Sequence, residues 1–206
     1  MGVQERRARE KDETRRKILS AASDLFVNEG IQSISMRRIA DKIEYSPAAI
    51  YLYFKDKGEL VLSICQETFA ELDRRLTELE ELNLPPLEGF LRGCETYIRF
   101  GLEHPSHYIF TMCTPEENAT AKIDEQDYAE THELALQTFD HLRRCVRRCM
   151  EAGVFRTDDV ETISQMCWLS IHGVTAGLVT SSTFPFVDKD LLIRTQLETL
   201  ARGLRA

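Results

Sequence analysis

The stretch that decides the fold runs from residue 35 to residue 60 and reads SMRRIADKIEYSPAAIYLYFKDKGEL. Ser35 and Ser46 each precede an apolar repeat of helical spacing, where a hydroxyl can cap the first turn of a helix. Pro47 follows the second serine, at the first helical position, where a missing N–H is tolerated. Only Glu44 and Tyr45 separate the two repeats. The stretch therefore predicts two short helices joined by a tight turn.

A longer helix is predicted on each side of this pair. Before it, apolar residues recur at helical spacing from Asp12 until Gly30, which is placed to end the helix in a left-handed cap. After it, an Asp-x-x-Glu capping box at residues 56–59 opens a helix expected to end near Leu82. A long first helix that braces two short ones is the layout of a helix-turn-helix domain, which we place at residues 12–60.

The rest of the chain is predicted to be helical as well. Residues 1–11 carry four basic side chains and almost no apolar ones, so we expect a mobile basic arm there. Glycine and proline are scarce elsewhere, and a polar loop is expected at about 114–125. We therefore predict an all-α protein in which residues 61–206 form a larger helical ligand-binding and dimerisation domain. Its further helices are expected at about 87–103, 105–113, 126–151, 158–182 and 189–204.

Composition excludes several classes of protein. With 43% hydrophobic and 29% charged residues, the chain of 206 residues is typical of a globular protein rather than a disordered or fibrous one. No run approaches the roughly 18 apolar residues of a membrane span, and the charged N-terminus lacks the apolar core of a signal peptide. We therefore expect a cytoplasmic protein with no membrane partner. Its six cysteines are dispersed through helical segments, which favours reduced thiols.

The net charge of −8 is unevenly distributed along the chain. Residues 1–60 hold twelve Lys or Arg against ten Asp or Glu, whereas the remainder holds fourteen against twenty-four. A slightly basic module therefore precedes an acidic body, and only the first could face nucleic-acid phosphates.

The second short helix is predicted to read DNA. Its pattern turns Ile50 and Phe54 inward and leaves small residues and two tyrosines available to a major groove. Alanine methyls can contact a thymine methyl, and a tyrosine hydroxyl can reach a base edge or a phosphate. Independently, Lys57 lies in the first turn of the next helix, whose amides and positive dipole end attract a phosphate.

Residues 14–64 resemble the TetR family of bacterial regulators. The resemblance is carried by Phe26, Gly30, the run SMRRIA at 35–40 and the run YLYFKDKGEL at 51–60. It implies that Arg37 reaches the groove, that Pro47, Ala48, Ala49 and Tyr51 face bases, and that Tyr53 and Lys57 meet phosphates. The whole set of DNA-contacting residues expected on these grounds is Ser35, Met36, Arg37, Tyr45, Ser46, Pro47, Ala48, Ala49, Tyr51, Tyr53, Lys55 and Lys57.

One residue departs from the family pattern. Proteins of this family usually carry glycine after the second helix, where this chain has Glu44. A left-handed glutamate would cost about 1–2 kcal/mol. We therefore expect the turn to use another conformation, which affects how Tyr45 is presented to DNA.

The resemblance also implies that the acidic body binds a small effector. Trp168, His172 and Gly173 form Trp-x-x-x-His-Gly, which resembles a signature of one C-terminal subgroup of the family. Trp168, His172 and the neighbouring aromatic residues either belong to the ordinary hydrophobic core or line an apolar ligand site that contains a few polar groups. The candidate pocket consists of Tyr97, Phe100, His104, Tyr108, Phe110, Phe139, Trp168 and His172.

The same body is expected to form a homodimer. The segment 158–182 is apolar on nearly every side, which indicates burial on more than one face. Gly173 and Gly177, four residues apart, form a small-residue groove that permits close helix approach. The candidate interface residues are Gly173, Gly177, Leu178, Leu197 and Leu200.

Other functions have weaker support. No nucleophile with a base, no glycine-rich phosphate loop and no His-Glu-x-x-His motif appears, so we expect no enzyme, no cofactor and no metal. The main rival is a thiol- or metal-responsive regulator, because His141, Cys145 and Cys149 share a helix face amid arginines that could lower a thiol pKa. A basic architectural DNA binder disagrees with the acidic body. The partners predicted are double-stranded operator DNA, a small effector and a second copy of the chain.

Overall fold

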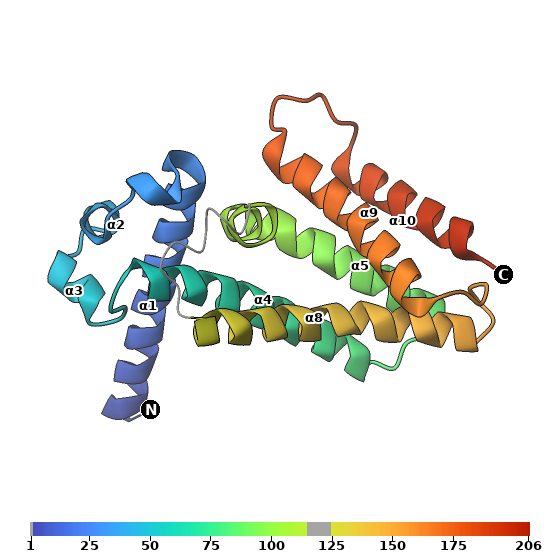
Figure 1. The fold of residues 1–206 in the computed structure, drawn as a ribbon, viewed down its shortest axis with the longest axis horizontal. Helices are drawn as coiled ribbons and strands as arrows, with labels where there is room; N and C mark the ends of the chain where they lie inside the picture. Colours follow the sequence, from blue (N-terminus) through green and yellow to red (C-terminus); the bar gives the residue numbers. More distant parts are fainter. Residues whose placement is uncertain (1, 115–124) are drawn as a thin grey trace. The chain divides into compact units, whose positions relative to one another are not determined.

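The computed structural model describes residues 2–114 and 125–206, apart from the side chains of residues 3, 125 and 127. Helices account for the regular structure of the described residues, as expected for an all-α protein, and no strand is formed there beyond an isolated bridge between Phe155 and Arg205 (Figure 1). The predicted loop at 114–125 lies largely outside the described residues. The helices are α1 (Val3–Glu29), α2 (Met36–Lys42), α3 (Pro47–Tyr51), α4 (Lys57–Glu81), α5 (Pro86–Glu103), α6 (Pro105–Tyr108), α8 (Glu125–Glu151), α9 (Val160–Thr180) and α10 (Lys189–Leu204), with a 3₁₀ turn η1 (Ile31–Ser33) and a π turn η2 (Ile109–Cys113).

The chain forms two compact units whose division differs from the predicted one at residue 60. Unit 1 comprises residues 1–68 and 106–131, and unit 2 comprises residues 69–105 and 132–206. The difference arises because η2 returns to the helix-turn-helix and inserts Phe110 into its core, with the Phe110 and Phe26 rings 5.3 Å apart. The DNA-binding part is therefore completed by a segment from the middle of the sequence.

Residues 3–11 correct the expectation of a mobile arm. They belong to α1, which begins at Val3 rather than near Asp12. The Gly2 amide donates to the Glu5 carboxylate at 2.8 Å, and Arg6 pairs with Glu10 at 3.3 Å, one helical turn further on. Because Arg and Glu are good helix formers and such i,i+4 pairs add support, a segment with almost no apolar residues continues the helix.

Unit 1 is held by one apolar core. Buried residues of α1, α2, α3 and the start of α4 meet around Phe54, which is 1% exposed, while Arg15 of α1 lies over its ring at 5.2 Å. The core comprises Ile18, Leu19, Ala22, Leu25, Phe26, Ile34, Met36, Ile39, Ala40, Ile50, Phe54, Leu60, Val61, Ile64 and Phe110.

Unit 2 is a layer of packed helices in which α5 contacts both α9 and α10 (Figure 1). Phe90 of α5 meets Phe155 edge to face at 5.0 Å, beneath the turn that joins α8 to α9. The Arg156 amide donates to the Leu204 carbonyl at 2.9 Å, so the last turn of α10 is tied to this turn. Within the described residues, no helix has the length and apolar character needed to cross a membrane.

Candidate DNA-reading surface and effector domain

Both predicted serine caps are confirmed. The Ser35 hydroxyl accepts from the Arg38 amide at 3.2 Å, and α2 begins at the next residue. The Ser46 hydroxyl accepts from the Ala49 amide at 3.2 Å, and Pro47 occupies the first turn of α3. Each cap satisfies one amide that has no partner within its own helix. The positions of both short helices are therefore encoded locally.

The turn between α2 and α3 overturns the expectation for Glu44. Its φ is 60°, so the glutamate adopts the left-handed conformation that glycine favours. The Tyr45 amide donates to the Ala40 carbonyl at 3.0 Å, and the Glu44 amide donates to the Asp41 carbonyl at 3.3 Å. This pair of bonds is a Schellman motif, which requires one left-handed residue after the helix. The hydrogen bonds that end α2 require the left-handed conformation, so the backbone of Glu44 is strained.

The predicted DNA-contacting residues divide between the surface and the core. Tyr51 is 55% exposed, and Arg37 and Ala48 are also exposed. Met36 is only 6% exposed and belongs to the core of unit 1, so its side chain is wrongly assigned to a DNA surface. It opens α2 with its side chain toward α1, because the cap at Ser35 fixes which face of the helix turns inward. The remaining exposed members are Ser35, Tyr45, Ser46 and Lys55, while Pro47, Ala49, Tyr53 and Lys57 are half-buried.

Lys57 makes contacts that the sequence did not reveal. Its ammonium donates to the Ile31 carbonyl at 2.8 Å and to the Ile34 carbonyl at 3.1 Å. These carbonyls belong to the connection between α1 and α2, where Ile31 opens the turn η1 and Ile34 ends it. Lys57 therefore fastens that connection to the start of α4. No pattern within the sequence links residue 57 to a carbonyl more than twenty positions earlier.

The start of α4 is capped by its own acidic residues. The Glu59 amide donates to the Asp56 carboxylate at 2.9 Å, as the predicted capping box requires. The Glu59 carboxylate accepts from the Lys55 amide at 2.6 Å, one residue earlier than the usual reciprocal bond. The connection from α3 to α4 is thereby ordered on both sides.

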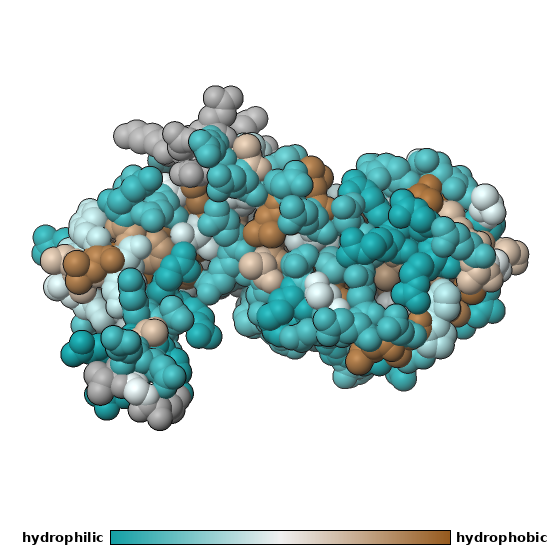
Figure 2. All heavy atoms as spheres, turned by 90° about the horizontal axis from the view of Figure 1, so that it is seen from below, coloured by the Kyte–Doolittle hydropathy of each residue, from teal (hydrophilic) through white to brown (hydrophobic). Residues whose placement is uncertain are grey.

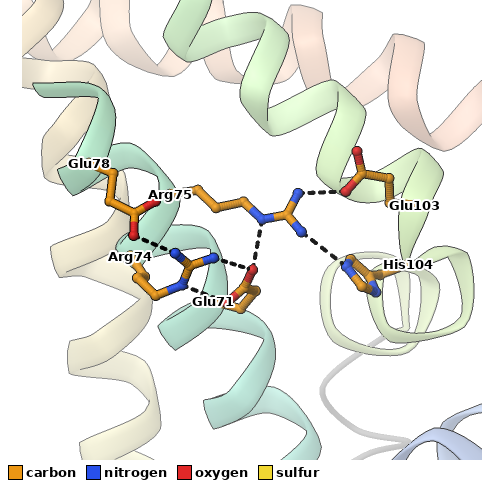
Figure 3. A network of polar contacts seen from close by, with 6 residues as sticks. All are labelled: Glu71, Arg74, Arg75, Glu78, Glu103 and His104. Atoms are coloured by element: carbon orange, nitrogen blue, oxygen red, sulfur yellow. Dashed lines mark hydrogen bonds and ion pairs between the residues drawn. The ribbon is translucent and has the colours of Figure 1, made fainter. Parts of the chain in front are cut away.

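In unit 2, Arg75 of α4 joins three groups (Figure 3). Its guanidinium contacts the Glu71 carboxylate on its own helix at 2.8 Å, the Glu103 carboxylate at the end of α5 at 2.6 Å and His104 Nε2 at 3.3 Å. It also lies over the Phe100 ring at 5.4 Å. Arg75 therefore connects α4 to the end of α5.

Glu71 is the shared acceptor of two arginines. Hydrogen bonds from Arg74 and then Arg75 lower the pKa of its carboxyl to about 2, against an ordinary value of 4.5. Because a planar guanidinium binds a carboxylate with two parallel N–H groups, this cluster is geometrically specific even at a partly exposed site.

Four of the candidate pocket residues form an aromatic cluster in unit 2. Trp168 stacks on His172 at 5.3 Å and meets Phe139 edge to face at 6.3 Å. The Tyr97 hydroxyl of α5 lies 3.2 Å from His172 Nδ1 of α9. Burial lowers the pKa of His172, which favours the neutral ring. The cluster thus combines apolar surface with two polar groups.

The structure separates the other candidate pocket residues. Phe100 and His104 belong to unit 2, whereas Tyr108 and Phe110 belong to unit 1. Phe110 is wrongly assigned to a pocket, since its ring lies in the helix-turn-helix core. Tyr108 is fully buried in the structure. The π turn η2 carries Phe110 toward α1, a placement that spacing after Pro105 could not predict.

His141 is a buried polar residue whose role the sequence analysis missed. Its Nε2 lies 2.9 Å from an Asp73 oxygen, and its Nδ1 lies 2.9 Å from a Glu80 oxygen and 2.8 Å from Arg144. Since Asp73 and Glu80 belong to α4 and His141 to α8, the histidine links these helices within unit 2. Its ring nitrogens are engaged in this polar network.

The pKa values of the cysteines on α8 and α9 are raised rather than lowered. Burial raises the pKa of Cys145, and this effect and that of Glu80 outweigh the lowering by Arg148 and Arg144. Burial also raises the pKa of Cys149 to about 11 and that of Cys167 to about 12. Thiolates rather than thiols react, and the raised pKa values favour the thiol form of these side chains at neutral pH. Among the described residues, no group of three or more His, Cys, Asp or Glu is arranged to hold a metal ion.

The candidate dimer residues are also divided. Gly173 is exposed and Gly177 half-buried on α9, while Leu178 and Leu197 are buried inside unit 2 and are wrongly placed on an outer surface. Leu200 is half-buried. The two leucines turn inward because α9 and α10 pack on each other and on α5. The exposed apolar residues of this region, which the sequence analysis missed, are Met166, Leu169, Phe184, Val187 and Leu191.

The capped pair α2 and α3, with an exposed surface on the second helix, defines a helix-turn-helix DNA-binding protein. Residues 18–64 match the family described as "Bacterial regulatory proteins, tetR family", and residues 90–200 match the "Tetracyclin repressor-like, C-terminal domain". The second match spans more than half of the chain. The chain therefore belongs to the TetR family of transcriptional regulators, whose members bind DNA.

Curated relatives agree over most of the chain. The regulator AcrR of Shigella flexneri is 24% identical over 197 residues, which is 88% of this chain and 84% of that protein. The repressor NicS of Pseudomonas putida is 26% identical over 184 residues, which is 88% of this chain and 85% of that protein.

Solved structures have the same fold. The ketosteroid transcriptional regulator KstR2 of Mycobacterium tuberculosis has a TM-score of 0.77 at 16% identity and covers 94% of this chain and 95% of its own. FadR of Bacillus subtilis, solved with stearoyl-CoA, has a TM-score of 0.72 at 18% identity and covers 92% of this chain and 98% of its own.

Proposed function

We propose that the protein is a homodimeric repressor that binds a palindromic operator and is released by a small, mainly apolar effector. The observation that carries the proposal is the exposed surface of α3, with Arg37 of α2 exposed in the same unit. A single helix of five residues makes too few base contacts to specify a genomic site, so two copies related by a two-fold axis are needed.

The outer face of α9 supports the dimer. Leu169 is 59% exposed, and Met166 lies two turns before Gly173 on the same helix. A Cβ atom added at Gly173 or Gly177 would meet no atom within 4 Å beyond its chain neighbours and the nearby backbone of its own helix. These positions are open within the protomer, so a second copy has room to approach the backbone closely. Apolar surface of this kind is the usual centre of a homodimer interface.

The dimer is tested by Gly173→Leu. Because the position is helical and open, leucine should leave the protomer as stable as the parent or stabilise it by up to about 1 kcal/mol. The same side chain would block the close approach of a second α9 and should shift the protein to monomer in sedimentation. Leu136→Glu, an exposed change on α8, is the matched control and should remain dimeric. An unchanged dimer in Gly173→Leu would refute this interface.

The aromatic cluster of unit 2 supports an apolar effector. Phe139 and Trp168 supply apolar surface, and Tyr97 and His172 supply polar groups that can orient a ligand. We interpret Trp168 and His172 of the Trp-x-x-x-His-Gly pattern as the effector-facing residues of α9, whereas Gly173 lies on its exposed outer face. Two proteins of the same fold are named for a ketosteroid or were solved with stearoyl-CoA, and a ketosteroid ring system and a stearoyl chain are both largely apolar.

The release mechanism rests on α4. This helix begins at Lys57 within unit 1 and continues into unit 2, where Arg75 and Glu71 connect it to the end of α5. An effector that moves the end of α5 would displace α4 through these contacts. Effector binding would then weaken operator binding, and operator binding would weaken effector binding by the same factor. The coupling free energy would be roughly 1–3 kcal/mol.

The function is tested with DNA selected by the protein itself from random duplexes. Operator binding is then measured by fluorescence anisotropy, with and without compounds that raise the melting temperature of the protein. Arg37→Ala should weaken binding by about 1–3 kcal/mol, whereas Arg92→Ala, an exposed change on α5, should not. Enrichment of no duplex would refute the DNA-binding role, and stabilising compounds without effect on operator affinity would refute the release mechanism.

A further inference from the structure

The surface of α3 and the turn before it carry several large, exposed apolar or aromatic side chains. Leu52 is 81% exposed, Tyr51 is 55% exposed, and Tyr45 at the preceding turn is exposed as well. Figure 2 shows apolar side chains, in brown, at the end of unit 1 where Figure 1 draws α3. One exposed leucine is ordinary, but several large apolar side chains within eight positions indicate a binding surface.

Leu52 shares this surface with Ala48. Leu52 is the C-cap of α3 and keeps helical angles, with φ −73° and ψ −16°. Because residues four apart lie on one face of a helix, we expect the Leu52 side chain to lie on the same face as that of Ala48, which is also exposed. Together they form an apolar strip beside Tyr51.

The polar inventory of the same stretch is short. From residue 45 to residue 52 the sequence is YSPAAIYL, so it contains no Arg, Lys, Asn, Gln, Asp or Glu. These are the side chains that make bidentate hydrogen bonds with guanine or adenine or accept from cytosine in the major groove. The Ser46 hydroxyl already accepts from the Ala49 amide as the helix cap. Only the tyrosine hydroxyls and that serine could hydrogen-bond a base from this stretch.

The major groove offers one apolar group, which is the C5-methyl of thymine. Exposed cations lie outside the apolar strip, at Arg37 on α2 and Lys55 after α3. Within the part of the chain that the structure describes, no ion pair includes either of them, so both charges are available to DNA. The unit thus presents an apolar strip with cations on the elements to either side of α3.

We propose that α3 reads its operator through thymine methyl groups, with Leu52 and Ala48 as the apolar contact and Leu52 as a specificity-determining residue. The proposal rests on the DNA-binding function proposed above and names the chemical group that this function recognises. When Leu52 and Ala48 approach the groove, they remove the thymine methyl group from water, which favours binding. Because these side chains do not contact the polar edge of the base, they displace no hydrogen bond there.

The test uses the full chain and an operator duplex enriched from a random library. Thymines of one half-site are replaced singly by uracil, which removes the methyl group and keeps the base pair. Replacement under α3 should weaken binding by about three- to fivefold for each contacted methyl, from the transfer value of one methyl-sized group. Uracil outside the half-sites should have no effect.

Leu52→Ala assigns the contact to a residue. Its high exposure means that the variant should fold like the parent, which its melting temperature checks. In this variant at least one thymine-to-uracil penalty should fall to less than twofold, whereas Leu136→Ala on α8 should keep every penalty. Such a loss is expected only if the leucine contacts that methyl.

The failures can be told apart. If no duplex is enriched, the proposed DNA-binding function falls and this inference with it. If an operator is enriched but every uracil duplex binds like its thymine parent, only the thymine reading is overturned. Uracil penalties that persist unchanged in Leu52→Ala would overturn the assignment to Leu52.

Discussion

Lys57→Met should lower the stability of unit 1. If Lys57 only contacted a DNA phosphate, the same substitution would lower DNA affinity and leave stability unchanged. The Lys57 ammonium donates to the Ile31 and Ile34 carbonyls at 2.8 and 3.1 Å. Methionine retains the length and apolar part of the side chain but donates no hydrogen bond. The substitution therefore leaves two loop carbonyls without their partner while it changes packing little.

The magnitude follows from these two bonds. A hydrogen bond that involves a charged group contributes about 1.5–3 kcal/mol in mutational series. The lysine is only half-buried, so water can partly replace the ammonium at the carbonyls, and both bonds depend on one charge. We therefore expect a loss of about 2 kcal/mol in total, rather than the sum of two full bonds. For a chain of this size such a loss lowers the melting temperature by roughly 4–8 °C.

Two probes locate the effect. Circular dichroism follows the helices of both units, whereas fluorescence of Trp168, the single tryptophan, follows unit 2. In urea, Lys57→Met should shift the dichroism transition. If the units unfold separately, the fluorescence midpoint should stay in place; if they unfold together, both midpoints should move equally.

Lys55→Met is the matched control. Lys55 is exposed, and no described ion pair involves its side chain, so its replacement should change stability by less than about 0.5 kcal/mol. The replacement should instead weaken binding to all DNA duplexes by the same factor. It should also reduce the slope of log affinity against log salt concentration by about one. If Lys57→Met unfolded like the parent and lost only DNA affinity, the lysine would act on phosphate and the structural reasoning would be refuted.

Three further predictions concern other sites. Glu44→Gly should raise the free energy of unfolding by about 0.5 kcal/mol in urea, because it relieves a left-handed glutamate but adds unfolded-state freedom; a loss would contradict the strain. Arg74 and Arg75 lower the pKa of Glu71 to about 2, so its stabilisation is full above about pH 4.5 and is lost as pH falls toward 2. Acid titration of Glu71→Gln should therefore show a shallower loss of stability than the parent, and equal curves would oppose this reasoning. Cys167, whose pKa burial raises to about 12, should react with iodoacetamide at pH 8 only after unfolding; prompt labelling of the native protein would argue for a reactive thiol.

The sequence determined where the reading helices begin, because the responsible interactions are local. A capping serine accepts from an amide only two or three residues further along the chain, so Ser35 and Ser46 placed α2 and α3 correctly. The later helices agree within a few residues for the same reason, since apolar spacing and proline act over one or two turns. The all-α class follows from these local signals.

The tertiary structure decided which face of each helix is buried and which distant groups meet. Spacing showed that Leu178 and Leu169 both lie on an apolar helix, but only packing against α5 and α10 buries the first and exposes the second. It also brought Phe110 to the core of unit 1 and Lys57 to the carbonyls of residues 31 and 34.

Glu44 shows why local rules alone were insufficient at one position. Intrinsic preference disfavours a left-handed glutamate, yet the hydrogen bonds that close α2 require that conformation. The packing of α3 against α1 and α2 fixes the path of the turn, and many contacts together outweigh about 1–2 kcal/mol of local strain. Local preference sets where helices start and stop, whereas contacts between residues far apart in the chain decide which side chains remain available to bind a partner.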